Sequence, residues 1–259
     1  MQKVTIKKIL NRKNKKPIVC LTAYSKAIAQ IADKYCDILL VGDSVGMVLY
    51  GMKSTRDIKI ETMILHAKTV KKFSKRSLVV FDMPYKTYTN KFVAYKNAKR
   101  IINLTKCDAI KLEGGKKIAS IIKYLISKKI PVVGHIGLLP QTSVNFKVKG
   151  KISSQRKKIL EDAKAVSNSG AFAIIIECVV ENLAKIITKK IPIPTIGIGA
   201  SRNCDGQILV IDDMLGLSEH YPKFVKQYSN LKKIIEKSIK NYAKDVKLKR
   251  FPANKNIYK

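Results

Sequence analysis

The sequence contains no tryptophan, few aromatic residues of any kind (7%) and only 18 acidic residues against 52 basic ones. Arginine is also scarce, because almost all of the basic residues are lysines. Nucleic-acid recognition favours clustered arginines with aromatic side chains nearby, and the sequence has no such cluster. The formal net charge of +34 therefore does not predict specific nucleic-acid binding, although it can steer anionic substrates.

Long apolar runs are absent as well, so the sequence predicts no transmembrane helix. The basic N-terminal segment lacks the continuous apolar region of a secretory signal. The five cysteines are scattered and form no CxxC pair, which argues against a disulfide framework or a structural zinc site. Together these features predict a reducing compartment, and we expect the cytoplasm.

What the sequence does contain is a regular alternation of short apolar runs and longer segments with helical spacing. Eight strands are predicted, at 18–22, 38–41, 78–81, 109–112, 132–134, 173–176, 195–198 and 208–211. Helices are predicted at 25–34, 61–73, 92–104, 117–127, 155–167 and 182–189, with a C-terminal helical region at about 222–246. This pattern predicts one α/β domain over residues 1–259, a (β/α)₈ TIM barrel with an N-terminal capping segment. An open doubly wound sheet is the alternative, because periodicity does not show whether the sheet closes.

Polar residues follow most of these apolar runs at the point where each strand is expected to end. Asp43 and Ser44 follow the second run and Asp82 the third; the further ones are Lys111 and Glu113, His135, and Glu177. Lys111 and Glu113 are two residues apart, so the strand period places them on one face. Because parallel barrels carry out chemistry at the carboxyl ends of their strands, we expect these side chains to meet at one mouth.

Each of these residues also has a simpler interpretation. An aspartate or serine after a strand is often a turn residue or a helix cap, which applies to Asp43, Ser44 and Asp82. Lys111 could pair with Glu113 as a structural ion pair, and His135 could be an ordinary core residue. We assign His66 and His220 to structure or surface, and Cys178 to packing.

The set as a whole favours a metal site. Asp43, Asp82 and Glu113 offer hard oxygen ligands without cysteine or histidine, which favours Mg²⁺ or Mn²⁺ over zinc. A metal beside Lys111 can hold a 2-oxo acid by its carboxylate and keto oxygen, which acidifies the neighbouring carbon. Glu177 lies outside the metal set and is predicted to be the base that removes the proton.

A co-linear set of motifs resembles the 3-methyl-2-oxobutanoate hydroxymethyltransferase (ketopantoate hydroxymethyltransferase) family. The motifs are ILLVGDSVGM, FDMPY, AIKLEGG, PVVGHIGLLPQ, AFAIIIECV, PTIGIGAS with NCDGQILV, and DDMLGL. TAYS near the start and PKFVKQY and FPANKNIY near the end extend the likeness over nearly the whole chain.

The resemblance implies a barrel of the phosphoenolpyruvate/pyruvate type. It implies transfer of a one-carbon unit from 5,10-methylenetetrahydrofolate to 3-methyl-2-oxobutanoate, giving 2-dehydropantoate for the synthesis of pantothenate, a precursor of coenzyme A. It also implies one Mg²⁺ per subunit, small-molecule substrates and a homodecamer. Carried over by position, the metal residues are Asp43, Asp82 and Glu113, the keto-acid contacts are Asp43, Ser44, Asp82, Lys111 and His135, and the proton acceptor is Glu177.

The chain departs from the family pattern at a few positions. The family usually has TAYD, ECVP and LTPQ where this chain has Ser25, Val180 and Leu139. The stretch 144–151 is a few residues shorter than in the family. Loops after barrel strands commonly act as lids, so this difference bears on lid closure and folate contact. No predicted metal or base position is changed, and we expect activity.

Two other functions compete with this one. A related Mg²⁺-dependent carbon–carbon lyase or phosphonopyruvate mutase would share the fold and the metal chemistry, but the KKCGH-type loop expected of the lyases is absent. A basic barrel that has lost activity and binds nucleic acid or acidic partners is the third possibility. The intact residues at every predicted site position argue against it.

Overall fold

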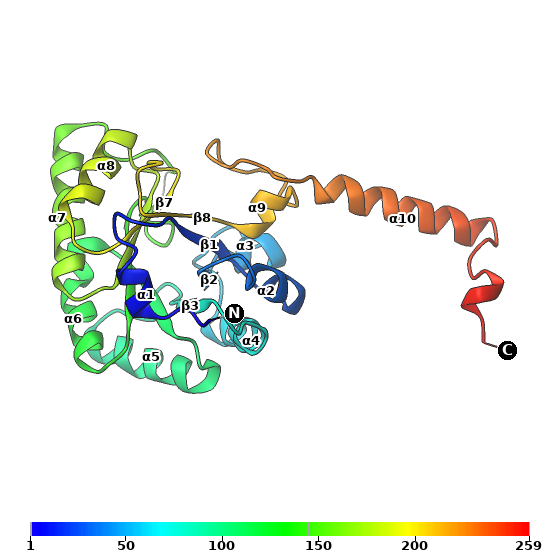
Figure 1. Ribbon diagram of the computed structural model, residues 1–259, viewed down its shortest axis with the longest axis horizontal. Coiled ribbons are helices and arrows are strands. Elements are labelled where there is room, and N and C mark those ends of the chain that lie inside the picture. The colour runs from blue at the N-terminus through cyan, green and yellow to red at the C-terminus, as the bar shows by residue number, and fades with distance from the viewer. Residues whose placement is uncertain (1, 144–145, 259) are drawn as a thin grey trace. The chain divides into compact units, whose positions relative to one another are not determined.

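Eight parallel strands close into a barrel, in which each strand pairs with the next and β8 pairs with β1 (Figure 1). The computed structural model describes residues 2–143 and 146–258. The strands are β1 Ile18–Thr22, β2 Ile38–Val41, β3 Leu78–Asp82, β4 Ala109–Glu113, β5 Val132–Gly137, β6 Ala173–Glu177, β7 Thr195–Ile198 and β8 Gly206–Leu209. The predicted (β/α)₈ barrel is confirmed, and the open doubly wound sheet is wrong.

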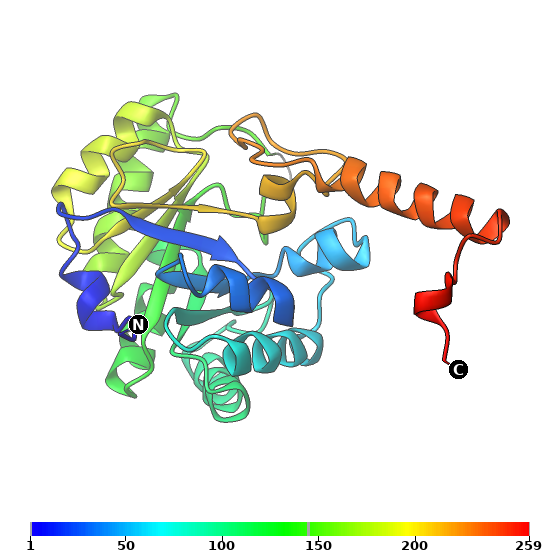
Figure 2. The same ribbon diagram turned by 45° about the vertical axis from the view of Figure 1, so that its right-hand side comes forward.

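Helices lie outside the strands (Figures 1 and 2). They are α2 Lys26–Ala32, α3 Val45–Tyr50, α4 Ile60–Phe73, α5 Lys91–Thr105, α6 Ala119–Ser127, α7 Ser153–Asn168 and α8 Glu181–Lys190, and a 3₁₀ turn at Gly115–Ile118 leads into α6. Every residue of β2, β3 and β4 is buried. Strands covered on both faces read as continuous apolar runs, which explains why the sequence predicted them well.

Helix α5 illustrates how local sequence and packing agree. The Asn90 side chain accepts hydrogen bonds from two backbone N–H groups of the first turn and so caps the helix. The residues that α5 buries are Ala94, Ala98, Ile101 and Thr105. Their spacing of three and four residues forms the single face that packs on the barrel.

The eighth strand lies two residues earlier than the sequence predicts. β8 begins at Gly206, which pairs with Ile18 of β1 and Ile196 of β7. A Cβ atom at Gly206 would lie 2.5 Å from the Ile18 carbonyl oxygen, so only glycine allows this approach. Ile211, predicted to end the strand, instead begins a helix. The predicted bounds 208–211 are wrong because a glycine contributes no apolar side chain to the pattern that indicates a strand.

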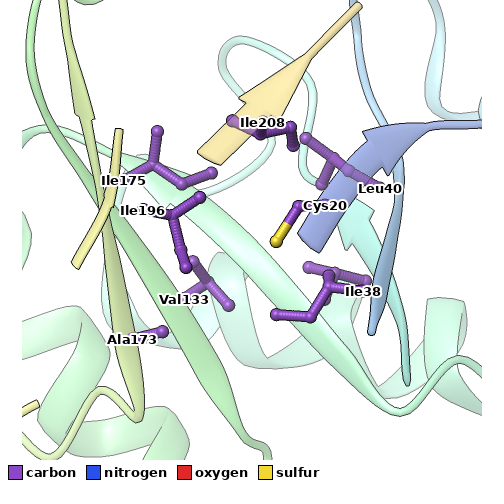
Figure 3. A pocket seen from close by; sticks show the side chains of 9 residues that line it. Cys20, Ile38, Leu40, Val133, Ala173, Ile175, Ile196 and Ile208 are labelled. Atoms are coloured by element: carbon purple, nitrogen blue, oxygen red, sulfur yellow. The ribbon is translucent and has the colours of Figure 1, made fainter. Parts of the chain in front are cut away.

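The amino-terminal ends of the strands are closed by apolar packing. A short helix, α1 Ile6–Leu10, places the buried Ile9 in the same cluster as Ile18 and Leu78. Inside the barrel, a small cavity has only apolar lining (Figure 3). Its lining residues are Cys20, Ile38, Leu40, Val80, Val133, Ala173, Ile175, Ile196 and Ile208. With no polar side chain to bind a substrate, this part of the interior is core, and the polar side chains predicted to act lie at the carboxyl ends of the strands.

The residues from Ile211 onward form a second compact unit. It contains α9 Ile211–Leu215, α10 Leu231–Lys247 and a 3₁₀ turn at Asn254–Asn256. No residue of α10 is buried. Among the described residues, no helix is long and apolar enough to cross a membrane. That residues 1–259 form a single domain remains a prediction.

Candidate active site

The register of neighbouring strands brings the predicted site residues together. Asp82 of β3 lies opposite Lys111 of β4, and Glu113 of β4 lies opposite His135 of β5. Glu177, the last residue of β6, lies opposite Gly137. Because the barrel is closed and parallel, these pairings place polar side chains from four consecutive strands at one end of the barrel.

Lys111 and Asp82 form a buried ion pair at the centre of this end. The Lys111 Nζ atom lies 2.8 Å from Oδ1 and 2.9 Å from Oδ2 of Asp82, and 3.8 Å from Oε1 of Glu113. Burial lowers the pKa of Lys111, but the negative charges of Asp82 and Glu113 outweigh it and raise the pKa. The lysine is therefore charged, and its main partner is Asp82 rather than Glu113, the partner considered from sequence.

His135 lies between two carboxylates. Its Nδ1 atom is 3.2 Å from Oε1 of Glu113, and its Nε2 atom is 3.2 Å from Oε2 of Glu177. Neither contact has hydrogen-bond geometry, so both are charge contacts. Burial and the Lys111 charge lower the pKa of His135, but the two glutamates outweigh them and raise it to about 9. The imidazole is thus a cation at neutral pH and not an ordinary core histidine.

Asp43 and Ser44 follow β2 and occupy the same end. The Asp43 carboxylate is buried and accepts a hydrogen bond from Gln141 Nε2 at 2.8 Å. Burial first, and then the charge of Asp82, raise the pKa of Asp43 well above its usual value. Ser44 makes no side-chain cap to α3, and its hydroxyl instead shares a hydrogen bond with the Tyr24 hydroxyl at 2.8 Å. Ser44 is nevertheless the N-cap residue of α3, because its backbone carbonyl oxygen accepts from the N–H groups of Met47 and Val48; the cap is made by the backbone and not by the hydroxyl.

Glu177 is the most accessible carboxylate of the group. Its side chain is 17% exposed, whereas those of Asp82 and Glu113 are 2% exposed. A Cβ atom at Gly137 would lie 2.3 Å from the Glu177 carbonyl oxygen, so the neighbouring strand must carry glycine there. Cys178 follows, and burial, with the Glu177 charge, raises the pKa of its thiol to about 11. A thiol that stays protonated fits the packing role predicted for Cys178.

The sequence did not single out two residues that the structure places among the carboxylates. Gln141 is fully buried, and the Tyr88 hydroxyl donates a hydrogen bond to its side-chain oxygen. The Gln141 backbone N–H donates to Oε2 of Glu113 at 3.1 Å. Neither residue ends an apolar run, so strand-end reasoning could not find them. Their presence in or beside the quoted motifs FDMPY and PVVGHIGLLPQ was the one available signal.

The histidines predicted to be structural lie away from these contacts. His66 Nδ1 is 2.7 Å from the Tyr24 carbonyl oxygen, and its Nε2 is 2.9 Å from the Tyr50 hydroxyl. Tyr24 follows β1, Tyr50 ends α3, and His66 itself lies in α4. These contacts therefore join α3 and α4 to the chain after β1. His220 is exposed in the second unit.

The polar loop after β5 runs beside the segment that follows Glu177. Lys149 forms a parallel bridge with Val179, and its backbone N–H donates to the Cys178 carbonyl oxygen at 2.7 Å. Val144 and Asn145, the first residues of the shortened stretch, lie outside the described residues. A lid role for this loop stays a prediction.

The charge balance of the site fits a divalent cation. Four carboxyl groups (Asp43, Asp82, Glu113 and Glu177) share the site with two basic groups (Lys111 and His135), so negative charge is in excess. The Asp43 backbone N–H donates to Oδ2 of Asp82 at 3.3 Å, which places the two aspartates side by side. Mg²⁺ is commonly held by one or two carboxylates, with water and substrate completing its shell.

The three predicted metal residues do not form a ready-made cage. Within residues 2–143 and 146–258, no group of three or more His, Cys, Asp or Glu side chains is arranged to hold a metal ion alone. Asp43 and Asp82 are the adjacent pair, while Glu113 faces Lys111 and His135. The residues therefore fit a metal with few protein ligands, such as Mg²⁺, and do not fit a structural zinc site.

Two proteins that share a name are similar to this chain over nearly its whole length. The chain is 54% identical over 255 residues to the 3-methyl-2-oxobutanoate hydroxymethyltransferase of Pelagibacter ubique, covering 97% of this chain and 99% of that protein. It is 50% identical over 264 residues to the enzyme of the same name from Bartonella tribocorum, covering 100% of this chain and 97% of that protein.

Solved structures support the fold alone. A phosphonopyruvate hydrolase in complex with oxalate and Mg²⁺ matches with a TM-score of 0.64 at 10% identity, over 99% of this chain and 93% of that one. A 2,3-dimethylmalate lyase of the PEP mutase/isocitrate lyase superfamily matches with a TM-score of 0.64 at 11% identity, over 97% of this chain and 87% of that one.

The family profile described as ketopantoate hydroxymethyltransferase matches residues 3–254, and the chain belongs to this family.

Proposed function

We propose that this chain transfers a one-carbon unit from 5,10-methylenetetrahydrofolate to 3-methyl-2-oxobutanoate, giving 2-dehydropantoate for pantothenate synthesis. The match to the hydroxymethyltransferase family over residues 3–254 is the observation that carries the proposal. The charged groups at the barrel mouth supply a chemical reason for it. Lys111 and His135 can bind an anion. Asp43 and Asp82 can bind a metal ion, and Glu177 is accessible as a base.

The keto acid would bind through the cations and hydroxyl of the site. Lys111 and His135 are both charged, so they favour an anionic substrate, and Lys111 lies between Asp82 and Glu113. The Ser44 hydroxyl, oriented by Tyr24, supplies a further hydrogen-bonding group. Water exclusion at this buried end strengthens each of these interactions.

Glu177 would act as the base. Its carboxylate is the most exposed of the site and is therefore the one a substrate atom can reach. It would take the proton from C3 of the keto acid, leaving an enolate whose charge spreads onto the keto oxygen. The His135 ring, whose Nε2 atom lies 3.2 Å from Oε2 of Glu177, would orient this carboxylate.

Asp43 and Asp82 would hold Mg²⁺, with Glu113 contributing negative charge from the neighbouring strand. When bound, Mg²⁺ polarises the keto group and thereby makes the C3 proton more acidic. Gln141 and Lys111 hold the two aspartates in place. The folate methylene carbon then loses both of its C–N bonds, forms the new bond to the enolate carbon and takes a hydroxyl group from one water. The remaining proton of that water and the proton taken up by Glu177 go to the two folate nitrogens, which leaves tetrahydrofolate.

An assay of the purified chain with both substrates tests the proposal. We expect 2-dehydropantoate to form only when Mg²⁺, 5,10-methylenetetrahydrofolate and 3-methyl-2-oxobutanoate are all present. Exchange of the C3 proton with deuterium should need Mg²⁺ but no folate. Cleavage of a 2-oxo acid without folate would instead support a related lyase and contradict the proposal.

We further propose that the chain acts in the cytoplasm as a homo-oligomer, a homodecamer by family resemblance. Ile235, Ile239, Tyr242 and Val246 form an exposed stripe along α10, with the spacing of one helix face. Val19, on the outer face of β1, is 47% exposed, although helices usually cover that face of a barrel. A second copy of the chain carries the same two apolar surfaces and could therefore cover those of the first.

Light scattering on the purified chain tests the assembly. We expect a mass that is a multiple of 29.1 kDa, and a smaller mass for an Ile235→Lys, Ile239→Lys variant. A matched variant outside the stripe on the same helix, at the exposed Glu236 (Glu236→Lys), should leave the mass unchanged. A monomeric unaltered chain would contradict the proposed assembly.

A further inference from the structure

Gln141 connects more of the active site than any role assigned above requires. It lies after β5, is fully buried, and donates from Nε2 to two acceptors. These are Oδ2 of Asp43 at 2.8 Å and the carbonyl oxygen of Met83 at 3.0 Å. Met83 directly follows Asp82, so one amide group bridges the chain after β2 and the chain after β3.

The orientation of this amide is set by Tyr88. The Tyr88 hydroxyl donates to Oε1 of Gln141, which leaves the NH₂ group facing Asp43 and Met83. The same hydroxyl accepts the Glu113 backbone N–H at 3.3 Å. If the amide were reversed, its oxygen would face a carboxylate and a carbonyl, and two acceptors would be left without a donor.

The backbone of Gln141 is fixed as well. Its N–H donates to Oε2 of Glu113 at 3.1 Å, and its carbonyl oxygen accepts from Nε of Arg56 at 2.8 Å. Arg56 also donates to the Ser143 carbonyl oxygen at 3.2 Å and lies over the Tyr85 ring. Gln141 thus touches two of the three predicted metal carboxylates, Asp43 by its side chain and Glu113 by its backbone.

We propose that Gln141 is a positioning residue that holds the Asp43 carboxylate in the orientation needed to bind the metal and the keto acid. The inference rests on the proposed function, because it assigns Asp43 to the metal pair. The Asp43 carboxylate is buried beside Asp82, and the fixed amide donor on its Oδ2 atom leaves its other oxygen free for the metal. Residues that orient metal ligands in this way typically affect metal affinity by about 10- to 100-fold.

A Gln141→Met variant tests the proposal, because methionine has a similar shape and no amide. We would measure Mn²⁺ binding by the loss of free Mn²⁺ signal in electron paramagnetic resonance, and 3-methyl-2-oxobutanoate binding by calorimetry with Mg²⁺ present. We expect Mn²⁺ affinity to fall by about 10- to 100-fold, and KM for the keto acid to rise more than kcat falls. Gln30→Met, the same change at an exposed position of α2, is the matched control and should change neither.

Tyr88→Phe provides a second variant that keeps Gln141 but frees its amide. The change removes the hydrogen bond to Gln141 and the one that the hydroxyl accepts from the Glu113 backbone N–H, but it keeps the Gln141 amide. We therefore expect a smaller effect, about two- to tenfold in Mn²⁺ affinity. If Gln141→Met does not fold, this variant alone decides the question. Unchanged Mn²⁺ affinity and KM in a folded Gln141→Met or, failing that, in Tyr88→Phe would overturn the inference while leaving the proposed function intact. Failure of the unaltered chain to bind Mn²⁺ would contradict the proposed function itself.

Discussion

The ammonium group of Lys111 donates to both carboxylate oxygens of Asp82, at 2.8 and 2.9 Å, with both side chains almost completely buried. Removing two charges from water costs several kcal/mol, and the attraction between them offsets the cost only when the geometry is good. The pair is therefore a poor way to stabilise a barrel and a good way to hold a cation where an anionic substrate binds. Its position at the strand ends agrees with the second role.

Replacing Lys111 by methionine should destabilise the protein and impair substrate binding together. The change leaves Asp82 as an uncompensated buried charge, which typically costs about 3–5 kcal/mol. Urea denaturation in the absence of metal measures the loss of stability. We also expect Mg²⁺ to recover part of it, because a cation can replace the missing charge.

Lys232→Met is the matched control for this variant. Lys232 also pairs with a carboxylate, that of Glu219 at 3.2 Å, but the two side chains are 57% and 77% exposed. Exposed ion pairs contribute about 0–1 kcal/mol, so its removal should shift the urea midpoint little. Equal midpoints for the two variants would show that burial of the Lys111 pair carries no energetic consequence.

Replacing Glu177 by glutamine should stop proton removal while leaving binding in place. The amide keeps the size of the side chain but does not accept a proton. We expect exchange of the C3 proton of 3-methyl-2-oxobutanoate in D₂O, followed by NMR, to slow by about 10²- to 10⁴-fold. Calorimetry should still detect the keto acid with Mg²⁺.

Glu161→Gln makes the same chemical change on an exposed position of α7 and should exchange at the original rate. Because Glu177 faces His135, its variant also tests that contact. Exchange at the original rate in Glu177→Gln would remove this residue from the role of base, and Cys178 or a bound water would then need examination.

Replacing Asp82 by asparagine should weaken metal-dependent binding of the keto acid by on the order of tenfold or more. Asparagine preserves an acceptor for Lys111 but removes one negative charge from the metal pair. Titration of keto-acid binding against Mg²⁺ concentration measures the effect. An unchanged Mg²⁺ dependence would exclude Asp82 from the metal site.

Asp33→Asn is a control at the other end of the barrel. Burial raises the pKa of Asp33, but the backbone N–H groups of Ser77, Arg76 and Lys75 outweigh it and lower the pKa. The carboxylate therefore contributes stability at neutral pH that is lost as the pH falls through its lowered pKa. Asp33→Asn should thus lower stability at neutral pH without changing the Mg²⁺ titration.

The cysteine thiols should resist alkylation while the protein is folded. Burial is the main cause that raises the pKa of Cys36, Cys107 and Cys178 to about 11. At pH 8 the thiolate fraction is then about two orders of magnitude below that of an ordinary cysteine. Because these thiols bind protons more tightly in the folded state, their contribution to stability is lost as the pH rises through about 11.

Iodoacetamide labelling followed by mass spectrometry measures the rate at which each cysteine thiol is alkylated. Labelling at pH 8 should be slow in the folded protein, fastest at the half-buried Cys178, and complete in urea. Rapid labelling of Cys178 under folding conditions would instead indicate a reactive thiol beside Glu177. That outcome would contradict its assignment to packing.

The strand ends were the part of the site that sequence could predict. Each buried strand reads as an apolar run, so a polar residue at its end stands out, as Asp82 and Glu177 did. The period of two correctly placed Lys111 and Glu113 on one face. Even so, the predicted strands 78–81, 109–112 and 173–176 stopped one residue short, because a terminal carboxylate does not look like part of a strand.

Contacts between distant segments were beyond sequence reasoning. Gln141 reaches Asp43 across 98 positions, and no local pattern distinguishes it from an ordinary loop residue. The choice of Asp82 over Glu113 as the partner of Lys111 depends on the register of β3 against β4. Register is a property of two strands together, so one strand's residues do not specify it.

The sequence by itself determined the alternation of strands and helices, the polar residues at the strand ends and the family motifs. These are local properties, set by side-chain hydrophobicity and spacing along one segment. Only the tertiary structure decided that the sheet closes, that His135 lies between two glutamates and that Gln141 donates to Asp43. Closure and side-chain partners depend on the packing of segments far apart in the chain, because burial and charge act through space rather than along the sequence.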